Sequence, residues 1–357
     1  MVAQKAPKLL FIPVSSAEGI GEYMRSMIIA DEVKRNWPHA DIKFILSKHA
    51  PYAAQCPYNA VLLDDTPTKQ VKAVNQIITE YLPDIVIFDA SGRKSQLAHA
   101  HKLGAKVVFI SQHKRKRSRG MKIGRALVTD CHWVVQPEFV IGPISGLERL
   151  KLKLINKPIP LNIGPVFTQP DEACQTGLLA QYQLTKNEFV LFNAGSGGHK
   201  VNGELAADIF AQAAYESYKA SGIVSVMVFG PNYPNPQPEL EGVVVIPQLN
   251  NQHFINLLAA SKAAVLSGGD TLLQAIALHK PTLAVPVSKD QPPRIEKCVS
   301  EKYVISCETK SEAMGHKIAL LLDPTLANQL MTSLARGEQL NGLDVAIKEL
   351  AFLLDLG

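Results

Sequence analysis

The chain has 357 residues, of which 46% are hydrophobic and 19% are charged, with a net charge of +5 at pH 7. These values predict a globular protein of two domains, and the modest charge excess argues against a general polyelectrolyte-binding protein. Five scattered cysteines without paired metal-ligand spacing fit a reducing cytoplasm. No apolar run approaches the roughly 20 residues of a membrane span, and the N-terminal apolar stretch is too short for a signal peptide.

The first predicted strand, Lys8 to Val14, leads into a glycine-containing loop and an amphipathic helix that ends toward Pro38. Glu22 lies in the first turn of that helix. A carboxylate there can act as a general base if burial raises its pKa, whereas the positive end of the helix dipole favours the anion. Three interpretations stay open: a catalytic base, a first-turn acid that merely suits the dipole, or a lost activity.

Further strands are predicted at residues 41–46, 60–63, 85–89, 107–110 and 133–135, alternating with helical stretches, and they complete the first sheet. Asp89 ends one of these strands. It can orient or replace the base, or it can cap the helix that begins near Arg93.

A run of basic residues follows the strand at residues 107–110. We call five of them the basic cluster: Lys114, Arg115, Lys116, Arg117 and Arg119. Most charge runs are solvated surface, but this cluster can attract an acceptor phosphate or the anionic headgroups of a membrane. Nucleic-acid binding is the less favoured use, because no aromatic-rich binding surface or known nucleic-acid module accompanies the cluster.

Four prolines between Pro158 and Pro170 break regular structure and predict the domain boundary. We expect an N-terminal domain at residues 1–165 and a C-terminal domain at residues 166–357. The last helix, expected at residues 343–354, can pack back on the N-terminal domain.

Two glycine-rich segments dominate the second half of the chain. A predicted strand at residues 188–194 runs into Gly195-Ser196-Gly197-Gly198-His199-Lys200, ahead of a helix expected from about Asn202 to Ala220. A second strand, at residues 263–266, runs into Ser267-Gly268-Gly269 and a helix that Asp270 or Thr271 can cap. Free N–H groups at a helix start favour a phosphate.

An ordinary strand-turn-helix unit is the alternative for either segment alone. Two such units, separated by predicted strands at residues 224–229 and 243–246, favour a doubly wound sheet with a ligand at the carboxyl edge of its strands.

The segments GSGGHK (residues 195–200) and SGGDTLLQAIALHKPTLAVPVSKDQ (residues 267–291) resemble the nucleotide-sugar-binding half of GT-B glycosyltransferases. The similarity is greatest to the lipid II-forming N-acetylglucosaminyltransferase and to the UDP-sugar hydrolase of pseudaminic acid synthesis. It implies an α/β fold of two Rossmann-like doubly wound domains that face each other across a cleft, with the acceptor in the first and the donor in the second. Residues 19–25, GIGEYMR, are similar to the Gly-x-Gly-His-x-x-Arg start of these relatives, so Glu22 stands where they carry a catalytic His.

The resemblance also implies how a donor is bound. Diphosphate contacts fall to the glycine segments, with basic side chains in place of a metal, and the nucleotide base lies beside the loop that follows residues 243–246. The ribose position holds a neutral amide where the family usually has Glu, which leaves the donor open because the charge-assisted acceptor is lost. The donor-binding residues are thus Ser196, Gly197, Gly198, His199, Lys200, Gly268, Gly269 and Thr271 for the diphosphate, Leu249 and Asn250 for the base, Gln274 for the ribose, and Asp290 and Gln291 for the sugar.

The leading hypothesis is a metal-independent glycosyltransferase without a cofactor. It would move a sugar from a nucleotide-diphosphate donor, a UDP-sugar, to a hydroxyl of a glycolipid or polysaccharide acceptor of the cell envelope. We expect it in the cytoplasm, in peripheral contact with the inner face of the cytoplasmic membrane through the basic cluster. The alternatives are a nucleotide-sugar hydrolase and a GT-B-like binding protein that has lost its base.

Overall fold

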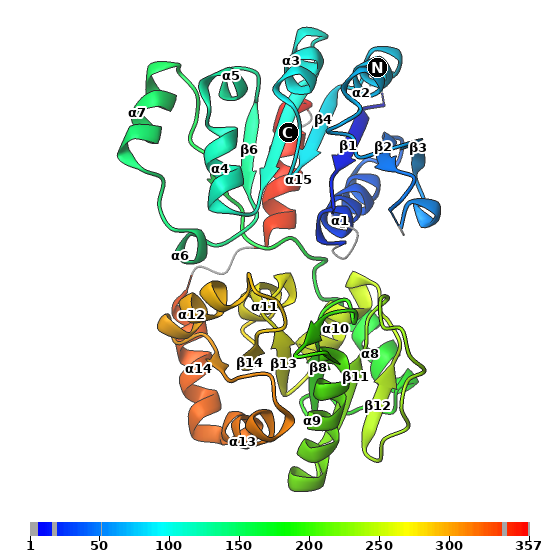
Figure 1. Ribbon diagram of the computed structural model, residues 1–357, viewed down its shortest axis with the longest axis vertical. Coiled ribbons are helices and arrows are strands. Elements are labelled where there is room, and N and C mark those ends of the chain that lie inside the picture. Colours follow the sequence, from blue (N-terminus) through cyan, green and yellow to red (C-terminus); the bar gives the residue numbers. More distant parts are fainter. Residues whose placement is uncertain (1–5, 16–19, 51, 338–340, 356–357) are drawn as a thin grey trace. The chain divides into compact units, whose positions relative to one another are not determined.

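The computed structural model divides the chain into two α/β units (Figure 1). The first unit comprises Met1–Val166 and Asn341–Gly357, and the second comprises Phe167–Leu340. The structure describes residues 6–15, 20–50, 52–337 and 341–355. Residues 16–19 of the predicted first loop, Gly19 among them, lie outside these ranges.

The first unit contains a seven-stranded parallel sheet in the order β3-β2-β1-β4-β5-β6-β7. Its strands are β1 (Lys8–Pro13), β2 (Asp41–Ser47), β3 (Asn59–Leu63), β4 (Ile85–Asp89), β5 (Lys106–Ser111), β6 (Cys131–Val134) and β7 (Leu161–Asn162). Its helices are α1 (Gly21–Asn36), α2 (Val71–Tyr81), α3 (Lys94–Lys102), α4 (Lys114–Gly120), α5 (Ile123–Ala126), α6 (Glu138–Ile141), α7 (Gly146–Leu154) and α15 (Gly342–Leu353), with a 3-10 turn at Ala53–Gln55.

The second unit contains a six-stranded parallel sheet in the order β12-β11-β8-β13-β14-β15. Its strands are β8 (Phe189–Asn193), β11 (Val224–Val228), β12 (Val243–Ile246), β13 (Ala263–Ser267), β14 (Thr282–Val285) and β15 (Ile305–Ser306), and β9 (Lys200–Val201) pairs with β10 (Glu204–Leu205) in a separate hairpin. Its helices are α8 (Glu172–Gln181), α9 (Ala206–Ser221), α10 (Asn251–Ala260), α11 (Asp270–Ala277), α12 (Pro292–Ser300), α13 (Ser311–Leu322) and α14 (Pro324–Arg336).

The central strands of both sheets are apolar at nearly every position, because helices cover both faces of each sheet. β4 and β8, for example, are buried at all their residues. The predicted α/β architecture with two doubly wound sheets is confirmed.

The last helix, α15, belongs to the first unit and packs against α1. Leu343, Ala346 and Leu350 of α15 are buried in the same apolar cluster as the inner face of α1. Gly342 lets this segment approach closely, since a Cβ there would lie 2.8 Å from the carbonyl oxygen of Gly164.

Candidate functional site

The two glycine-rich segments follow the two neighbouring strands at which the second sheet changes direction. From β8 the chain continues outward to β11 and β12, and it then returns to β13 on the other side of β8. Leu266 of β13 lies beside Asn193 of β8 in the parallel register. This is the topological switch point, the place where open α/β sheets bind ligands outside the carboxyl ends of their strands.

The first glycine loop, residues 195–198, has a backbone that only glycine adopts without strain. Gly195 and Gly197 both have φ of +92°. A Cβ on Gly197 would lie 2.6 Å from the carbonyl oxygen of Phe229, and one on Gly195 would lie 3.3 Å from Ser267 Oγ. The backbone of this loop therefore packs closely against the backbone at Phe229, and Gly195 lies near Ser267, where the second glycine segment begins.

Asn193 holds the first glycine loop in place, a role that the sequence did not reveal. Its Oδ1 accepts a hydrogen bond from the Gly195 N–H at 3.0 Å, and its Nδ2 donates to the carbonyls of Gly195 and Val228 at 3.1 and 2.9 Å. A polar residue at the end of an otherwise apolar strand is the one signal that could have indicated it.

The predicted helix from about Asn202 is wrong at its start. A β-hairpin, β9 and β10, lies between the first glycine loop and α9, which begins at Ala206. Asn202 and Gly203 form its turn with φ of +52° and +90°, as an Asn-Gly type I′ turn requires. His199 and Lys200 are consequently not at a helix start: Lys200 is exposed in β9, and His199 lies just before it.

The second glycine loop, Ser267 to Gly269, does open a helix, α11. Its N-cap is Gly269, so Asp270 is the first helical residue rather than the cap, and Thr271 lies half-buried in the first turn. Apart from its two chain neighbours, the nearest described atom to a Cβ built on Gly269 is Ser267 Oγ, at 3.8 Å. Side chains of the described residues therefore leave space beside the start of α11.

Gln291 and Arg294 fix the second glycine loop from the β14–α12 side. Gln291 Oε1 accepts hydrogen bonds from the N–H groups of Gly268 and Val287, at 3.1 and 2.8 Å. Arg294 Nη1 donates to the carbonyl oxygen of Gly268 at 2.6 Å. Both side chains are buried, so the amide oxygen of Gln291 serves the loop itself, and Arg294 is a further residue that sequence reasoning missed.

The remaining predicted donor residues lie in the same unit. Gln274 is buried on α11, one turn beyond its start. Asp290 is exposed and accepts a hydrogen bond from Ser288 Oγ at 2.7 Å. Asn250 caps α10 by accepting from the His253 N–H at 2.8 Å, and Leu249, which precedes it, is half-buried.

In the first unit, Asp89 lies at the corresponding switch point, between β1 and β4. It is fully buried and forms a two-fold hydrogen-bonded ion pair with Arg25 of α1: Nε to Oδ2 at 3.0 Å and Nη2 to Oδ1 at 2.7 Å. Burial raises the pKa of Asp89, while the Arg25 guanidinium acts in the opposite direction. Both carboxylate oxygens of Asp89 accept hydrogen bonds from Arg25, and the N-cap of α3 is Arg93, so Asp89 does not cap that helix.

Glu22 is more accessible than Asp89. It is the second residue of α1, its side chain is 17% exposed, and its Oε1 lies 3.8 Å from Lys116 Nζ. The phenol of Tyr52 has a raised pKa because of its burial and the nearby Glu22 charge. Ser15 Oγ accepts from the Tyr23 N–H at 3.1 Å and so binds an N–H group in the first turn of α1.

The five residues of the basic cluster are not all exposed, so they do not form one surface. Arg117 is buried, and its guanidinium donates to the carbonyls of Gly142 and Pro143 at 2.7 and 3.0 Å, which holds the loop before α7. Lys116 is half-buried beside Glu22. Only the other three members are exposed: Lys114, Arg115 and Arg119.

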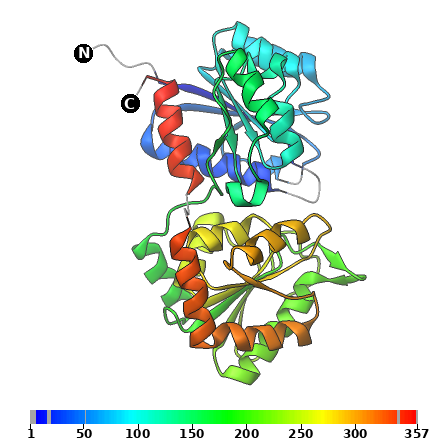
Figure 2. The ribbon, with the colours of Figure 1, turned by 90° about the vertical axis from the view of Figure 1, so that its left-hand side faces the viewer.

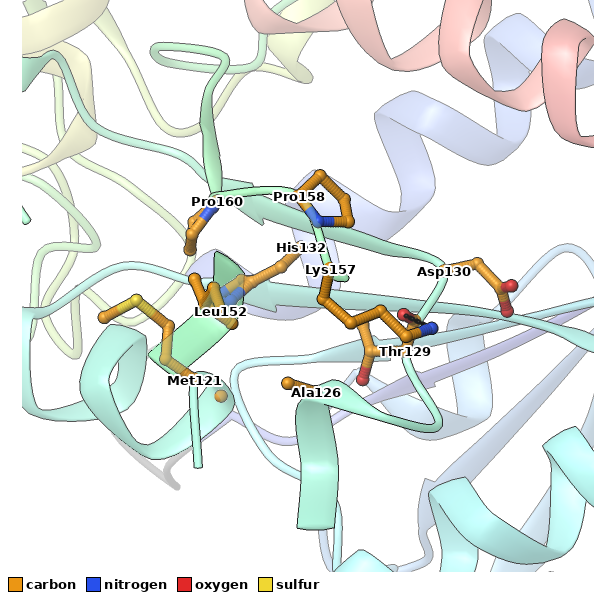
Figure 3. A pocket seen from close by; sticks show the side chains of 10 residues that line it. Met121, Ala126, Thr129, Asp130, His132, Leu152, Lys157, Pro158 and Pro160 are labelled. Atoms are coloured by element: carbon orange, nitrogen blue, oxygen red, sulfur yellow. Dashed lines mark hydrogen bonds between the residues drawn. The ribbon is translucent and has the colours of Figure 1, made fainter. Parts of the chain in front are cut away.

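A small cavity of about 20 Å³ lies inside the first unit, beneath His132 of β6 (Figure 3). Its volume suits a single water molecule rather than a substrate. Ser111 Oγ lies 2.9 Å from His132 Nε2, and burial, with a smaller effect of Arg117, lowers the pKa of His132 to about 3. His132 is thus a neutral interior residue.

We expect this histidine to make stability depend on pH. Its folded pKa lies below the unfolded value, so the unfolded chain binds more protons as the pH falls below about 6.5. The free energy of unfolding should then decrease, by at most about 1.4 kcal/mol per pH unit. Urea denaturation of the wild type and of His132→Gln between pH 7 and pH 4.5 measures this, because the free energy of unfolding should depend less on pH in the variant. The control is His39→Gln, which replaces an exposed histidine and should keep the pH dependence of the wild type. If the free energy of unfolding of His132→Gln changed with pH as much as that of the wild type, the expectation would be wrong.

Among the residues that the structure describes, no three His, Cys, Asp or Glu side chains gather as they would to hold a metal ion. Within the same ranges, no helix is long and apolar enough to cross a membrane.

No protein-family model and no curated protein matches this sequence. Solved structures match it over nearly its whole length. The spinosyn forosaminyltransferase SpnP has a TM-score of 0.65 at 13% identity, covering 98% of this chain and 100% of that chain. Phytolacca americana UGT2, complexed with UDP-2-fluoro-glucose and pterostilbene, has a TM-score of 0.63 at 11% identity, covering 98% and 100%.

The fold is also shared by a protein with another activity in its name. A putative UDP-N-acetylglucosamine 2-epimerase from Listeria monocytogenes has a TM-score of 0.56 at 16% identity, covering 97% of this chain and 95% of that chain. Identities this low carry information on the fold alone. The chain therefore has the GT-B fold, the fold of glycosyltransferases such as SpnP.

Proposed function

We propose that this chain is a glycosyltransferase that transfers a sugar from a UDP-sugar to a hydroxyl group of an acceptor, without a metal ion. The observation that carries the proposal is the pair of glycine loops at the switch point of the second sheet. Both present backbone rather than side chains, and the second opens a helix whose N–H groups suit a diphosphate. We propose UDP because UGT2 is complexed with UDP-2-fluoro-glucose and the Listeria protein is named a putative UDP-N-acetylglucosamine 2-epimerase.

The proposed reaction needs a base for the acceptor and hydrogen-bond donors for the leaving group. Glu22 removes the proton of the acceptor hydroxyl, whose oxygen bonds to the anomeric carbon of the donor sugar. The bond between that carbon and the diphosphate oxygen breaks, and its electron pair stays on the UDP that leaves. The N–H groups at the start of α11 stabilise the charge that develops on the departing phosphate.

Asp89 acts through α1 in this proposal. Its ion pair with Arg25 ties the helix that carries Glu22 to the end of β4. Lys116, from α4, has its Nζ 3.8 Å from Glu22 Oε1 and forms an ion pair with the proposed base.

We further propose an anionic acceptor, a glycolipid or polysaccharide precursor, near the exposed part of the basic cluster. A surface hollow of about 330 Å³ is lined by Arg115, Ser118, Arg119 and Lys122. Three cations and a hydroxyl suit a phosphate or carboxylate group. This acceptor would place the protein on the inner face of the cytoplasmic membrane.

Substitution of Gly197 tests the donor site. In Gly197→Ala, the added Cβ would lie 2.6 Å from a backbone oxygen, so the first glycine loop must shift, and we expect UDP to bind at least about tenfold more weakly. Isothermal titration calorimetry with UDP and a panel of UDP-sugars measures this. The matched control is Gly203→Ala, which has φ of +90° but nothing within 4 Å of the new Cβ. Wild-type protein that binds no nucleotide sugar, or two variants equally impaired, would overturn the assignment.

Product analysis separates the candidate reactions. A transferase releases UDP in equal amount to glycosylated acceptor. Hydrolysis, the alternative that the Gly19–Arg25 pattern suggests, releases UDP and free sugar without an acceptor. Donor binding without turnover would identify a binding protein instead.

A further inference from the structure

Arg294 of α12 is a buried cation beside the second glycine loop. It is 8% exposed, so it is buried without being sealed from solvent. Its Nη1 donates to the carbonyl oxygen of Gly268, and among the described residues its guanidinium has no other hydrogen bond and no ion pair. A buried charge is costly unless it is paired, because the protein interior solvates it poorly. An anionic ligand would supply the opposite charge that the described side chains do not.

The packing of α12 on the second glycine loop fixes the position of Arg294. A Cβ on Gly268 would lie 2.8 Å from Ile295 Cδ1 and 2.9 Å from Gln291 Cβ, so the start of α12 directly contacts the loop. In both ribbon views, α11 and α12, drawn in gold and orange, lie at the same end of the second sheet (Figures 1 and 2). Gly268 is followed by the N-cap and then by Asp270, the first residue of α11. The guanidinium therefore lies beside the N–H groups that we propose for the diphosphate.

A diphosphate at the start of α11 needs a cation nearby. The N–H groups and the helix dipole favour an anion there, but Asp270 adds a carboxylate to the same turn, and like charges repel each other. His199 and Lys200, the cations predicted from the sequence for this role, lie at the β9–β10 hairpin instead of at a helix start. Arg294 is a cation whose side chain bonds the second glycine loop itself.

We propose that Arg294 is the counter-ion of the donor's diphosphate, an inference that rests on the proposed function. Its Nη1 holds Gly268, and its other N–H groups would donate to phosphate oxygens, for which the planar guanidinium is well suited. When the bond between the anomeric carbon and the diphosphate oxygen breaks, its electron pair adds negative charge to that phosphate. A cation already fixed at this place lowers the energy of the charged leaving group, because no water has to reorganise around it.

The alternative is that Arg294 only holds the second glycine loop. Lysine and glutamine at this position separate the two roles, because both side chains can donate a hydrogen bond but only lysine keeps the positive charge. Uridine provides a check on the folded site, because it shares the base and the ribose with UDP and lacks the diphosphate. A counter-ion of the diphosphate should therefore matter for UDP and not for uridine.

The test is isothermal titration calorimetry of the full chain with UDP, together with a ligand-observed NMR titration with uridine. Arg294→Gln should bind UDP at least about tenfold more weakly than the wild type, whereas Arg294→Lys should stay within about threefold of it. Uridine should bind all three proteins equally. With rising salt concentration, the UDP affinity of Arg294→Gln should fall less steeply than that of the wild type, because one charge contact is lost. The matched control is Lys297→Gln, which removes an exposed cation of the same helix and should leave UDP binding unchanged.

Three results would overturn the inference and leave the proposed function standing. The first is a UDP affinity of Arg294→Gln equal to that of the wild type. The second is an equal loss in Arg294→Lys and Arg294→Gln, which would identify a residue that only holds the loop. The third is an equal loss in Lys297→Gln, which would identify a general effect of protein charge. A wild-type protein that binds neither UDP nor a UDP-sugar would overturn the proposed function as well, so the two failures are distinguishable.

Discussion

Asp89→Asn is expected to lower the free energy of unfolding of the first unit by about 3–5 kcal/mol, because it removes the carboxylate that forms a buried ion pair with the Arg25 guanidinium. Urea denaturation followed by tryptophan fluorescence measures this effect in the right unit, since both tryptophans, Trp37 and Trp133, belong to it.

The double variant Arg25→Met/Asp89→Leu provides the comparison. It removes both charges, so part of the lost stability should return. If Asp89→Asn alone unfolded at the same urea concentration as the wild type, the ion pair would not hold α1 on the sheet. The positioning role that we assign to Asp89 would then be wrong.

Glu22→Gln is expected to lower kcat by about 10²- to 10⁴-fold, the usual contribution of a general base, with little change in stability. The amide keeps the shape of the side chain but cannot take the acceptor proton. UDP release in the presence of acceptor measures kcat, and the binding of UDP should stay the same because the donor loops lie in the other unit.

The matched control for this variant is Glu32→Gln, the same substitution ten residues further along α1, where Glu32 pairs with Arg35. It should keep full activity. Should Glu22→Gln also keep it, the base lies elsewhere, and Glu22 is a first-turn acid that suits the helix dipole.

The glycine segments could be predicted in part. Gly268 and Gly269 do lead into a helix, as the apolar strand before them and the apolar stripe after them indicate. The segment after β8 was misread because a hairpin of two-residue strands is too short to show a period. The Asn202-Gly203 dipeptide was its one available signal.

Pairs that join distant segments could not be predicted. Arg25 and Asp89 are 64 residues apart, and only the pairing of β1 with β4 brings them together. An arginine on the apolar side of α1 indicates a buried partner but does not say which acid it is. In the same way, the identity of the residues that hold Gly268 depends on how the β14–α12 segment folds back.

The amino-acid sequence by itself determined the α/β class, the two doubly wound sheets and the glycine loops, because these depend on local periodicity and on backbone preferences of single residues. Only the tertiary structure decided which residues of a motif are exposed to solvent and which are buried. Arg117 turns inward while Arg119 stays in solvent, and the leucines of α7 divide into a buried side and an exposed side. Neighbouring residues of one type differ in this way because burial depends on contacts with segments far away in the chain.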